Sequence, residues 1–387
     1  MQLESFRVDI KQHVLDDLQH RLERTRWADD FANEQWDYGT NGAYLHELVD
    51  YWRTRYDWRQ HEARINHWPH FRTSIDGVPI HFMHIRGKGP SPMPLMLNHG
   101  WPWTFWDFQK LLAPLSDPGG HGGDPADAFD LIVPSLPGHG FSTPLTTPGV
   151  NFARTADLWV RLMNGLGYPR FASHGGDWGS FITAQLGHKY ADRLIGAHLS
   201  MMAPLDFATG GGIPREDYSP EEQPWAERTR QFFRNGSGYF ALQTTRPQTL
   251  SYALHDSPAG LCAWILEKRR AWSDCDGDVE RRFSKDDLLT TVMLYWLTNS
   301  FITSGRYYYE AVHQPWQPSH DRTPVVQTPT GIAVFLKEIM LRPRRWAERY
   351  YNVRQWNVYP SGGHFAPMEE PQVLTDDIRA FFRPLRS

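Results

Sequence analysis

The sequence has few cysteines, no long apolar run and little net charge, and each shortage excludes a class of protein. Its 387 residues include only two cysteines, Cys262 and Cys275. That is too few for a disulfide framework and favours a reducing compartment. No apolar stretch is long enough for a signal peptide or a transmembrane helix. The formal net charge of −4 gives no electrostatic reason to bind nucleic acid or a membrane surface. We therefore expect a soluble, cytoplasmic protein.

Signals for metal and nucleotide binding are also missing. Two His-Glu pairs, at 46–47 and 61–62, lack the second histidine that a zinc-binding helix needs. The glycine-rich run at 119–124 has no phosphate-loop lysine and follows no predicted strand, so a loop is expected there. The sequence predicts no metal and no cofactor.

The hydrophobic pattern divides the chain into an N-terminal arm, a core in two segments and an inserted cap. Residues 1–90, the arm, contain two amphipathic helices, an aromatic-rich and irregular stretch at 56–71, and a hairpin signal at Asp76-Gly77. Residues 91–201 and 323–387, the core, alternate buried strands with helices, which predicts an α/β fold with a mostly parallel sheet. Residues 202–322, the cap, begin with a loop containing Gly210-Gly211-Gly212 and are otherwise helical in pattern.

The most informative stretch is Gly175-Gly176-Asp177-Trp178-Gly179. It lies between an apolar run at 170–173 and a helical segment at 181–187, and small residues flank Asp177 on both sides. This is the pattern of a nucleophile elbow, a sharp strand-to-helix turn that usually carries serine. A carboxylate can attack an sp3 carbon without first losing a proton, which gives an ester that water must then hydrolyse. The plainer alternative is an aspartate that caps the following helix.

A base for that hydrolysis is expected after the last strand, where His364 lies in a Gly-Gly-His-Phe sequence. Its imidazole needs an acceptor that fixes the tautomer, and Glu338, after the strand ending at Phe335, is placed to serve. Glu369 and Glu370 are rivals, but their closeness to His364 in sequence favours capping of the next helix. The alternatives are that His364 is a loop histidine facing solvent and that Glu338 is a surface carboxylate at a helix start.

The sequence His99-Gly100-Trp101-Pro102 follows the first core strand, where an oxyanion-binding loop is expected. The backbone N–H groups of Trp101 and Trp178 could together bind the oxyanion formed during ester hydrolysis. An ordinary strand-to-helix turn is the alternative.

These three motifs give the chain its resemblance to a known family. Over nearly its whole length the chain resembles epoxide hydrolases of the α/β-hydrolase superfamily, in the branch that includes the microsomal enzymes and their soluble relatives. The resemblance implies an arm that wraps core and cap, and hydrolysis of an epoxide to a vicinal diol. It also implies two cap tyrosines that activate the epoxide oxygen, at the positions of Tyr239 and Tyr308. Phenols can donate a proton to the alkoxide that ring opening generates.

The resemblance also assigns substrate contacts and shows two departures from the family pattern. His99, Pro102 and Trp103 are expected to contact substrate. Trp103 stands where relatives often have glycine, which predicts a narrower pocket mouth. Leu336 stands where many relatives have proline, so the loop that carries Glu338 is expected to differ in shape.

Two other functions were weighed against epoxide hydrolysis. A haloalkane dehalogenase would use the same aspartate but would need N–H groups for a halide, whereas the arm and the paired tyrosines favour an epoxide. A catalytically silent binding protein is disfavoured because nucleophile, base, acid and both tyrosines are retained. An aromatic-lined pocket is expected, and the cap residues that suggest it are Trp264, Trp272, Trp296 and Phe301. The sequence leaves open which epoxide is used and whether the chain forms a homodimer.

Overall fold

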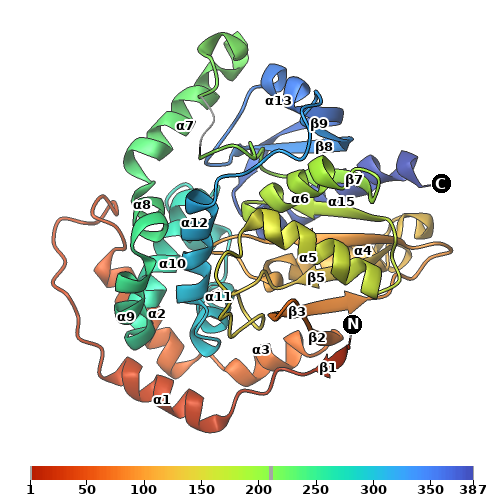
Figure 1. The fold of residues 1–387 in the computed structure, drawn as a ribbon. Coiled ribbons are helices and arrows are strands. Elements are labelled where there is room, and N and C mark those ends of the chain that lie inside the picture. The colour runs from red at the N-terminus through yellow and green to blue at the C-terminus, as the bar shows by residue number, and fades with distance from the viewer. Residues whose placement is uncertain (1, 209–211, 387) are drawn as a thin grey trace.

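The computed structural model describes residues 2–208 and 212–386, and their strands form one nine-stranded sheet with helices on both faces (Figure 1). The strand order is β1-β2-β3-β5-β4-β6-β7-β8-β9. The first three strands and the β3–β5 pair are antiparallel, and all pairs from β5 through β4 to β9 are parallel. The predicted mostly parallel sheet is confirmed.

The central parallel strands are largely buried. Strands β5 and β6 are buried at every position, which accounts for apolar sequences without alternation. The bounds are β4 Met93–Asn98, β5 Phe129–Pro134, β6 Phe171–Gly175, β7 Leu194–Leu199, β8 Val326–Lys337 and β9 Tyr351–Gly363. Each strand expected from the sequence is found, and the last two are longer than expected because their ends carry partly polar residues that still pair.

Helices cover both faces of this sheet. In Figure 1, α5 and α6 pack against each other in front of the sheet, and α4 packs against α15 behind it. Their bounds are α4 Gln109–Ser116, α5 Phe152–Gly165, α6 Trp178–Lys189 and α15 Pro371–Phe382. Two short helices that the sequence did not predict are α13 Arg344–Tyr350 and α14 Ala366–Glu369. Short 3-10 segments lie at 105–108, 119–121, 125–127, 215–217, 220–222, 279–281 and 383–385.

The arm runs along the outside of the cap before it joins the sheet (Figure 1). Its elements are β1 Glu4–Phe6, α1 Gln12–Glu23, α2 Gly42–Thr54, α3 Trp58–Ile65, β2 His70–Ile75 and β3 Val78–Ile85. Side-chain hydrogen bonds join it to the cap, for example from the Tyr44 hydroxyl to Glu280 (2.9 Å) and between the hydroxyls of Tyr56 and Thr290 (3.0 Å). The prediction of an irregular stretch at 56–71 was wrong for α3. Asp57 caps this short helix by accepting from the N–H of Arg59, and the apolar side of the helix is buried.

The cap is a set of helices beyond one end of the sheet. They are α7 Gln223–Asn235, α8 Gly238–Thr245, α9 Pro247–Asp256, α10 Pro258–Trp272, α11 Lys285–Leu297 and α12 Phe301–His313. All of them fall inside the range expected for a helical cap. The division of the chain into arm, core and cap stays a prediction, and in the expected loop at the start of the cap Gly210 and Gly211 lie outside the described residues.

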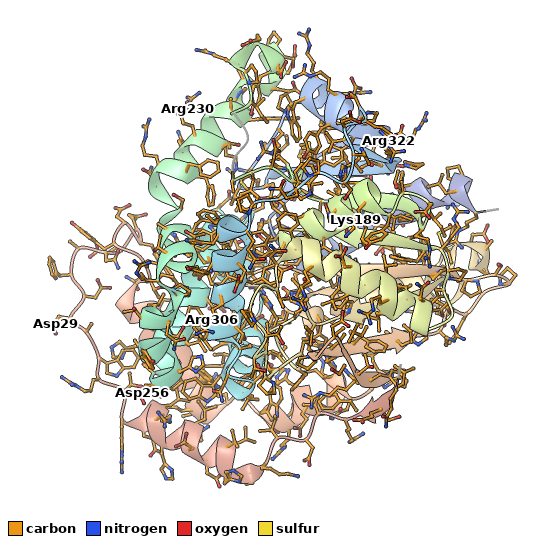
Figure 2. The ribbon with its side chains drawn as sticks, in the orientation of Figure 1. Asp29, Lys189, Arg230, Asp256, Arg306 and Arg322 are labelled. Atoms are coloured by element: carbon orange, nitrogen blue, oxygen red, sulfur yellow. The ribbon has the colours of Figure 1, made fainter. Side chains whose placement is uncertain are left out.

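Charged side chains lie mainly at the outside of the molecule, whereas the space between cap and sheet is aromatic. Figure 2 shows Asp29, Asp256 and Arg230 at the outer edge of the view. Between cap and sheet, Trp101 and Trp272 are almost completely buried and their ring centroids are 6.1 Å apart. The predicted catalytic residues meet in this aromatic region.

Candidate active site

Asp177 occupies a sharp turn between β6 and α6. Its backbone has φ 49° and ψ −128°, a conformation that non-glycine residues rarely adopt. A Cβ on Gly176 would lie 2.6 Å from the Trp103 ring, and one on Gly179 would lie 1.9 Å from the carbonyl oxygen of Asn98, so both flanking positions require glycine. The Asp177 side chain makes no capping hydrogen bond to α6. The capping alternative is therefore wrong, and the carboxylate faces away from its own helix.

The loop after β4 holds one oxygen of that carboxylate. The backbone N–H of Trp101 donates to Oδ1 of Asp177 over 2.8 Å. A Cβ on Gly100 would lie 2.1 Å from the same oxygen, so only glycine permits this approach. The second N–H expected at the site belongs to Trp178, which follows Asp177 and is the first residue of α6. Its role in binding the oxyanion stays a prediction.

His364 and Glu338 come together at the ends of β9 and β8. Nδ1 of His364 lies 2.9 Å from Oε1 and 3.1 Å from Oε2 of Glu338, and Nε2 lies 3.4 Å from Oδ2 of Asp177. Burial disfavours the charged imidazole, but the negative charges of Glu338 and Asp177 outweigh it and raise the pKa of His364 to about 10. At neutral pH the histidine is therefore an imidazolium between two carboxylates.

Glu369 and Glu370 do not cap α15, contrary to prediction. Glu369 accepts from the backbone N–H groups of Asp274 (2.7 Å), Gly363 (3.0 Å) and Phe365 (2.8 Å), and so holds the loop on both sides of His364. Its burial raises its pKa to about 7, although those N–H groups act against the shift. Glu370 forms an ion pair with Arg282 (3.0 Å). Both side chains thus contact cap residues, Asp274 and Arg282, and no pattern in the sequence indicated these contacts.

Tyr239 on α8 and Tyr308 on α12 line the same cavity as Asp177, which has a volume of about 650 Å³. Their ring centroids are 5.9 Å apart, and the Trp101 ring stacks on Tyr239 at 5.1 Å. Burial, together with the charge of Asp177, raises the pKa of both phenols well above the ordinary value. Both hydroxyls therefore keep their protons at neutral pH.

The two tyrosines beside Tyr308 lie elsewhere. The Tyr307 hydroxyl is hydrogen-bonded to that of Thr155 (2.9 Å), and the Tyr309 ring stacks on His313 at 3.8 Å. Neither is among the residues that line the cavity, and so the helix presents only Tyr308 of the three to the carboxylate.

The comparisons with known proteins identify the family of the chain. A family model described as the epoxide hydrolase N terminus matches residues 3–108, and one described as the alpha/beta hydrolase fold matches residues 93–371. A relative from Stigmatella aurantiaca is 44% identical over 99% of this chain and 85% of its own length. The chain belongs to the epoxide hydrolase family. Epoxide hydrolase 1 of Oryctolagus cuniculus is 36% identical, with 97% of this chain and 88% of that protein covered. The structure of Aspergillus niger epoxide hydrolase superposes with a TM-score of 0.87 at 30% identity, covering 100% and 97% of the two chains.

The predicted α/β-hydrolase fold and enzyme class of this epoxide hydrolase family member are thereby confirmed. Across residues 2–208 and 212–386, no helix combines the length and the apolar composition needed to cross a membrane. In the same residues, no three His, Cys, Asp or Glu side chains gather in a way that could hold a metal ion.

The predicted substrate contacts are not on the cavity wall. His99 is completely buried, and it accepts from the N–H of Leu136 (3.0 Å) while its other nitrogen lies 2.9 Å from the Gly100 carbonyl. It therefore braces the loop that contacts Asp177. Trp103 is also completely buried and packs edge-on against His364 at 5.6 Å, so it does not narrow a pocket mouth. The carbonyl of Pro102 accepts from Arg269 on α10 (3.2 Å).

The cavity is aromatic, as expected, but the wall is built from other residues. Trp264, Trp272, Trp296 and Phe301 do not line it. The aromatic residues that do are Trp178, Phe181, Phe207, Tyr218, Phe232, Phe233, Tyr239, Phe240, Tyr308, Trp346 and Tyr350. Trp272 packs behind the site instead, with ring centroids 4.9 Å from Tyr239 and 5.1 Å from His364.

Two residues that support the site were missed by sequence reasoning. Arg228 on α7 donates through Nε to the Glu338 carbonyl (2.8 Å) and through Nη2 to the Lys337 carbonyl (2.5 Å). Strand β8 runs through Leu336 with a register irregularity, and these bonds fix the residues that follow it. Lys268 on α10 is 6% exposed and places Nζ 5.3 Å from the ring centroid of Tyr239. Neither lies in a motif, and only the packing of the cap on the core reveals them.

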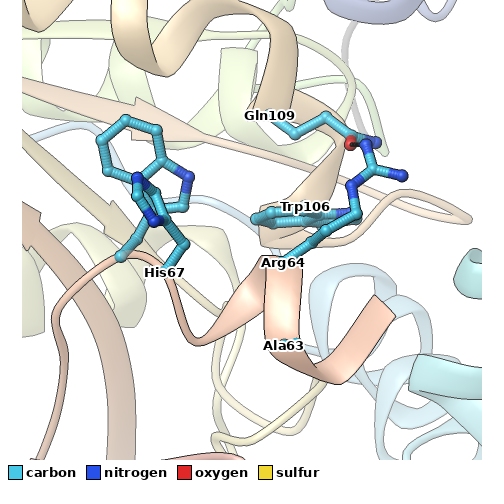
Figure 3. Close-up of a pocket in the computed structure, with 6 residues that line it drawn as sticks. Ala63, Arg64, His67, Trp106 and Gln109 are labelled. Carbon is cyan, nitrogen blue, oxygen red and sulfur yellow. Dashed lines mark hydrogen bonds between the residues drawn. The ribbon is translucent and has the colours of Figure 1, made fainter. Parts of the chain in front are cut away.

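A second pocket, of about 470 Å³, lies where the arm meets the core (Figure 3). Arg64, His67 and Trp106 line part of it, and Arg64 donates to the Gln109 side chain (3.1 Å). It contains none of the predicted site residues.

Proposed function

We propose that the enzyme hydrolyses an epoxide to a vicinal diol through a covalent ester of Asp177, with Tyr239 and Tyr308 as proton donors. The observation that carries the proposal is one cavity lined by Asp177 and both phenols, with the His364–Glu338 pair behind the carboxylate. An aspartate nucleophile facing two proton donors suits a strained ether whose carbon is attacked while its oxygen is protonated.

In the first step Oδ2 of Asp177 attacks one epoxide carbon. Oδ1 is held by the Trp101 N–H, which leaves Oδ2 as the oxygen that reacts. The C–O bond of the ring breaks, and the alkoxide takes a proton from the phenols of Tyr239 and Tyr308. Because both pKa values are raised, the phenols are protonated before the reaction. The phenol that donates becomes a phenolate, and it must regain a proton before the next turnover.

In the second step His364 activates water against the ester carbonyl. Esterification removes the negative charge of Asp177, which is one of the two charges that raise the pKa of His364. The histidine can then give its proton, through solvent, to the phenolate left by the first step, which restores the phenol. The neutral imidazole acts as a base toward water, while Glu338 stabilises the imidazolium that forms again. The oxyanion develops on Oδ1, where the Trp101 N–H and, as predicted, that of Trp178 can stabilise it. One such donor is typically worth ~10²–10³ in rate.

A single turnover in heavy-oxygen water tests this sequence of bonds. Water attacks the ester carbonyl, so the label is expected in the Asp177 carboxylate and the first diol is expected to carry unlabelled enzyme oxygen. Mass spectrometry of the peptide containing Asp177 and of the diol gives both readings. A first-turnover diol that carries the solvent label, with Asp177 unlabelled, would mean that water attacks the epoxide directly.

The haloalkane dehalogenase alternative predicts a different product. Two protonated phenols facing the carboxylate favour an oxygen leaving group that needs a proton, whereas a departing halide does not. Release of halide from chloroalkanes, with no diol from any epoxide in a broad panel, would replace the proposal with that alternative.

A further inference from the structure

Arg342 lies on the wall of the catalytic cavity, in the segment between β8 and α13. Its Nε donates to the carbonyl of Met202 (3.1 Å), and its guanidinium carbon lies 5.2 Å from the ring centroid of Trp346. One edge of the guanidinium is thereby fixed against the core. Burial lowers the pKa of Arg342, but an arginine side chain stays charged at neutral pH.

This cation has no carboxylate partner in the described part of the chain. Arg342 takes part in none of the ion pairs there, and neither of its terminal nitrogens has a hydrogen-bond partner among those residues. The groups that face it are the phenols of Tyr218, Tyr350 and Tyr351 and, beyond ion-pair distance, Asp206. A half-buried guanidinium normally pairs with an anion, because its charge is otherwise poorly compensated.

The neighbouring charges on the cavity wall are also mainly positive. Arg215 and Arg230 line the cavity with Arg342, and Asp206 is the acidic residue on this wall besides Asp177. Arg230 is paired with Glu227, whereas the Arg215 side chain donates to the neutral side chain of Gln223 (3.3 Å). Arg342 and Asp177 line the same cavity and form no ion pair with each other.

We propose that Arg342 binds the carboxylate of a substrate whose epoxide lies at Asp177, and that the substrate is therefore an epoxide with an anionic group at some distance from the ring. The position of the epoxide rests on the proposed function; the anion site does not. The planar fork of a guanidinium matches the two oxygens of a carboxylate, and one such charge-assisted contact is worth about tenfold or more in affinity. The aromatic residues of the cavity wall suit an apolar or aromatic linker between the epoxide and the carboxylate of the substrate.

Kinetics on a matched pair of substrates test the proposal. The pair is an aryl epoxide with a butanoate chain and the same epoxide with the primary amide in place of the acid. In the Arg342→Gln variant we expect kcat/KM for the acid to fall about tenfold or more, mainly through KM. The value for the amide should change less than about twofold, which also shows that the variant is folded. Arg322→Gln, at an exposed arginine remote from the cavity wall, is the control and should change neither value. Equal losses for acid and amide, or no loss for the acid, would overturn the proposal.

A binding measurement separates this proposal from the epoxide chemistry. Calorimetric titration with 5-phenylpentanoate and 5-phenylpentanamide needs no turnover. We expect the wild-type protein to bind the acid about tenfold more tightly than the amide, and Arg342→Gln to abolish that preference. If wild type turns over neither epoxide but keeps this preference, the proposed function fails and the anion site stands. Absence of a preference in wild type, or its persistence in the variant, refutes the anion site whatever the enzyme catalyses.

Discussion

Nε2 of His364 lies 3.4 Å from Oδ2 of Asp177, on the far side of the imidazole from its contact with Glu338. One histidine thus separates two carboxylates in a buried site. The arrangement makes its charge depend on the state of Asp177, because an esterified aspartate no longer stabilises the imidazolium. In the proposed mechanism, His364 is therefore a cation before the reaction and becomes a base only after Asp177 has been esterified.

Replacing both Tyr239 and Tyr308 with phenylalanine is expected to abolish epoxide opening while the fold is retained. The variant loses two hydroxyls and no ring packing, and a general acid typically contributes ~10²–10⁴ in rate. Single-turnover kinetics with an aryl epoxide measure the effect. Tyr307→Phe is the matched control, because that hydroxyl bonds to Thr155 and does not line the cavity. Near-wild-type turnover in the double variant would remove both tyrosines from the mechanism.

His364→Gln is expected to form the ester and fail to hydrolyse it. Asp177 attacks as a free carboxylate and needs no base, whereas the attacking water does. Intact-mass measurement should show the protein plus one epoxide, with the adduct on the peptide that contains Asp177. Asp177→Ala combined with His364→Gln should show no adduct. A single variant that neither forms an adduct nor turns over would assign His364 to the first step as well.

The raised pKa of His364 predicts how stability depends on pH. The folded-state pKa of about 10 exceeds the value of 6.5 for a histidine in the unfolded chain, so the contribution of this histidine is complete below about pH 6.5 and is lost as the pH rises toward 10. Urea unfolding of wild type and His364→Gln should therefore give a difference in unfolding free energy that shrinks by about 1.4 kcal/mol per pH unit in this range. Glu369, whose pKa is about 7, titrates in both proteins and cancels from the difference. A difference that does not change with pH would contradict the assigned charge.

Arg228→Met is expected to slow ester hydrolysis more than ester formation. The two carbonyls that Arg228 binds belong to Lys337 and Glu338, so its loss should let the acid shift away from His364. Misplacement of a catalytic group by about 1 Å can cost up to ~10² in rate. The ester should accumulate to a detectable fraction in the steady state, as measured by intact mass. Arg234→Met, at an exposed arginine on the same helix, should behave as wild type. Equal slowing of both steps would indicate a general loss of structure.

The sequence by itself determined the elements whose pattern is local. Buried strands, the helical cap and the glycine-flanked Asp177 could be predicted because strand burial and the elbow impose their own residue types. His364 and Glu338 could be located because each directly follows a recognisable strand. The helix α3 was missed because its signal, Asp57 as a cap and a few apolar residues, is short beside the aromatic residues around it.

The tertiary structure alone decided how these residues meet. It brings Glu369 onto the backbone of the His364 loop, directs Tyr308 rather than Tyr307 or Tyr309 toward Asp177, and places His99 and Trp103 behind the site. It also places Arg342 on the cavity wall, Arg228 against the Glu338 backbone and Lys268 beside the Tyr239 ring. All three come from segments far from the motifs. Such contacts depend on the angle at which the cap packs on the sheet. That angle is set by the sum of many weak apolar contacts between distant residues, and no local pattern in the chain encodes it.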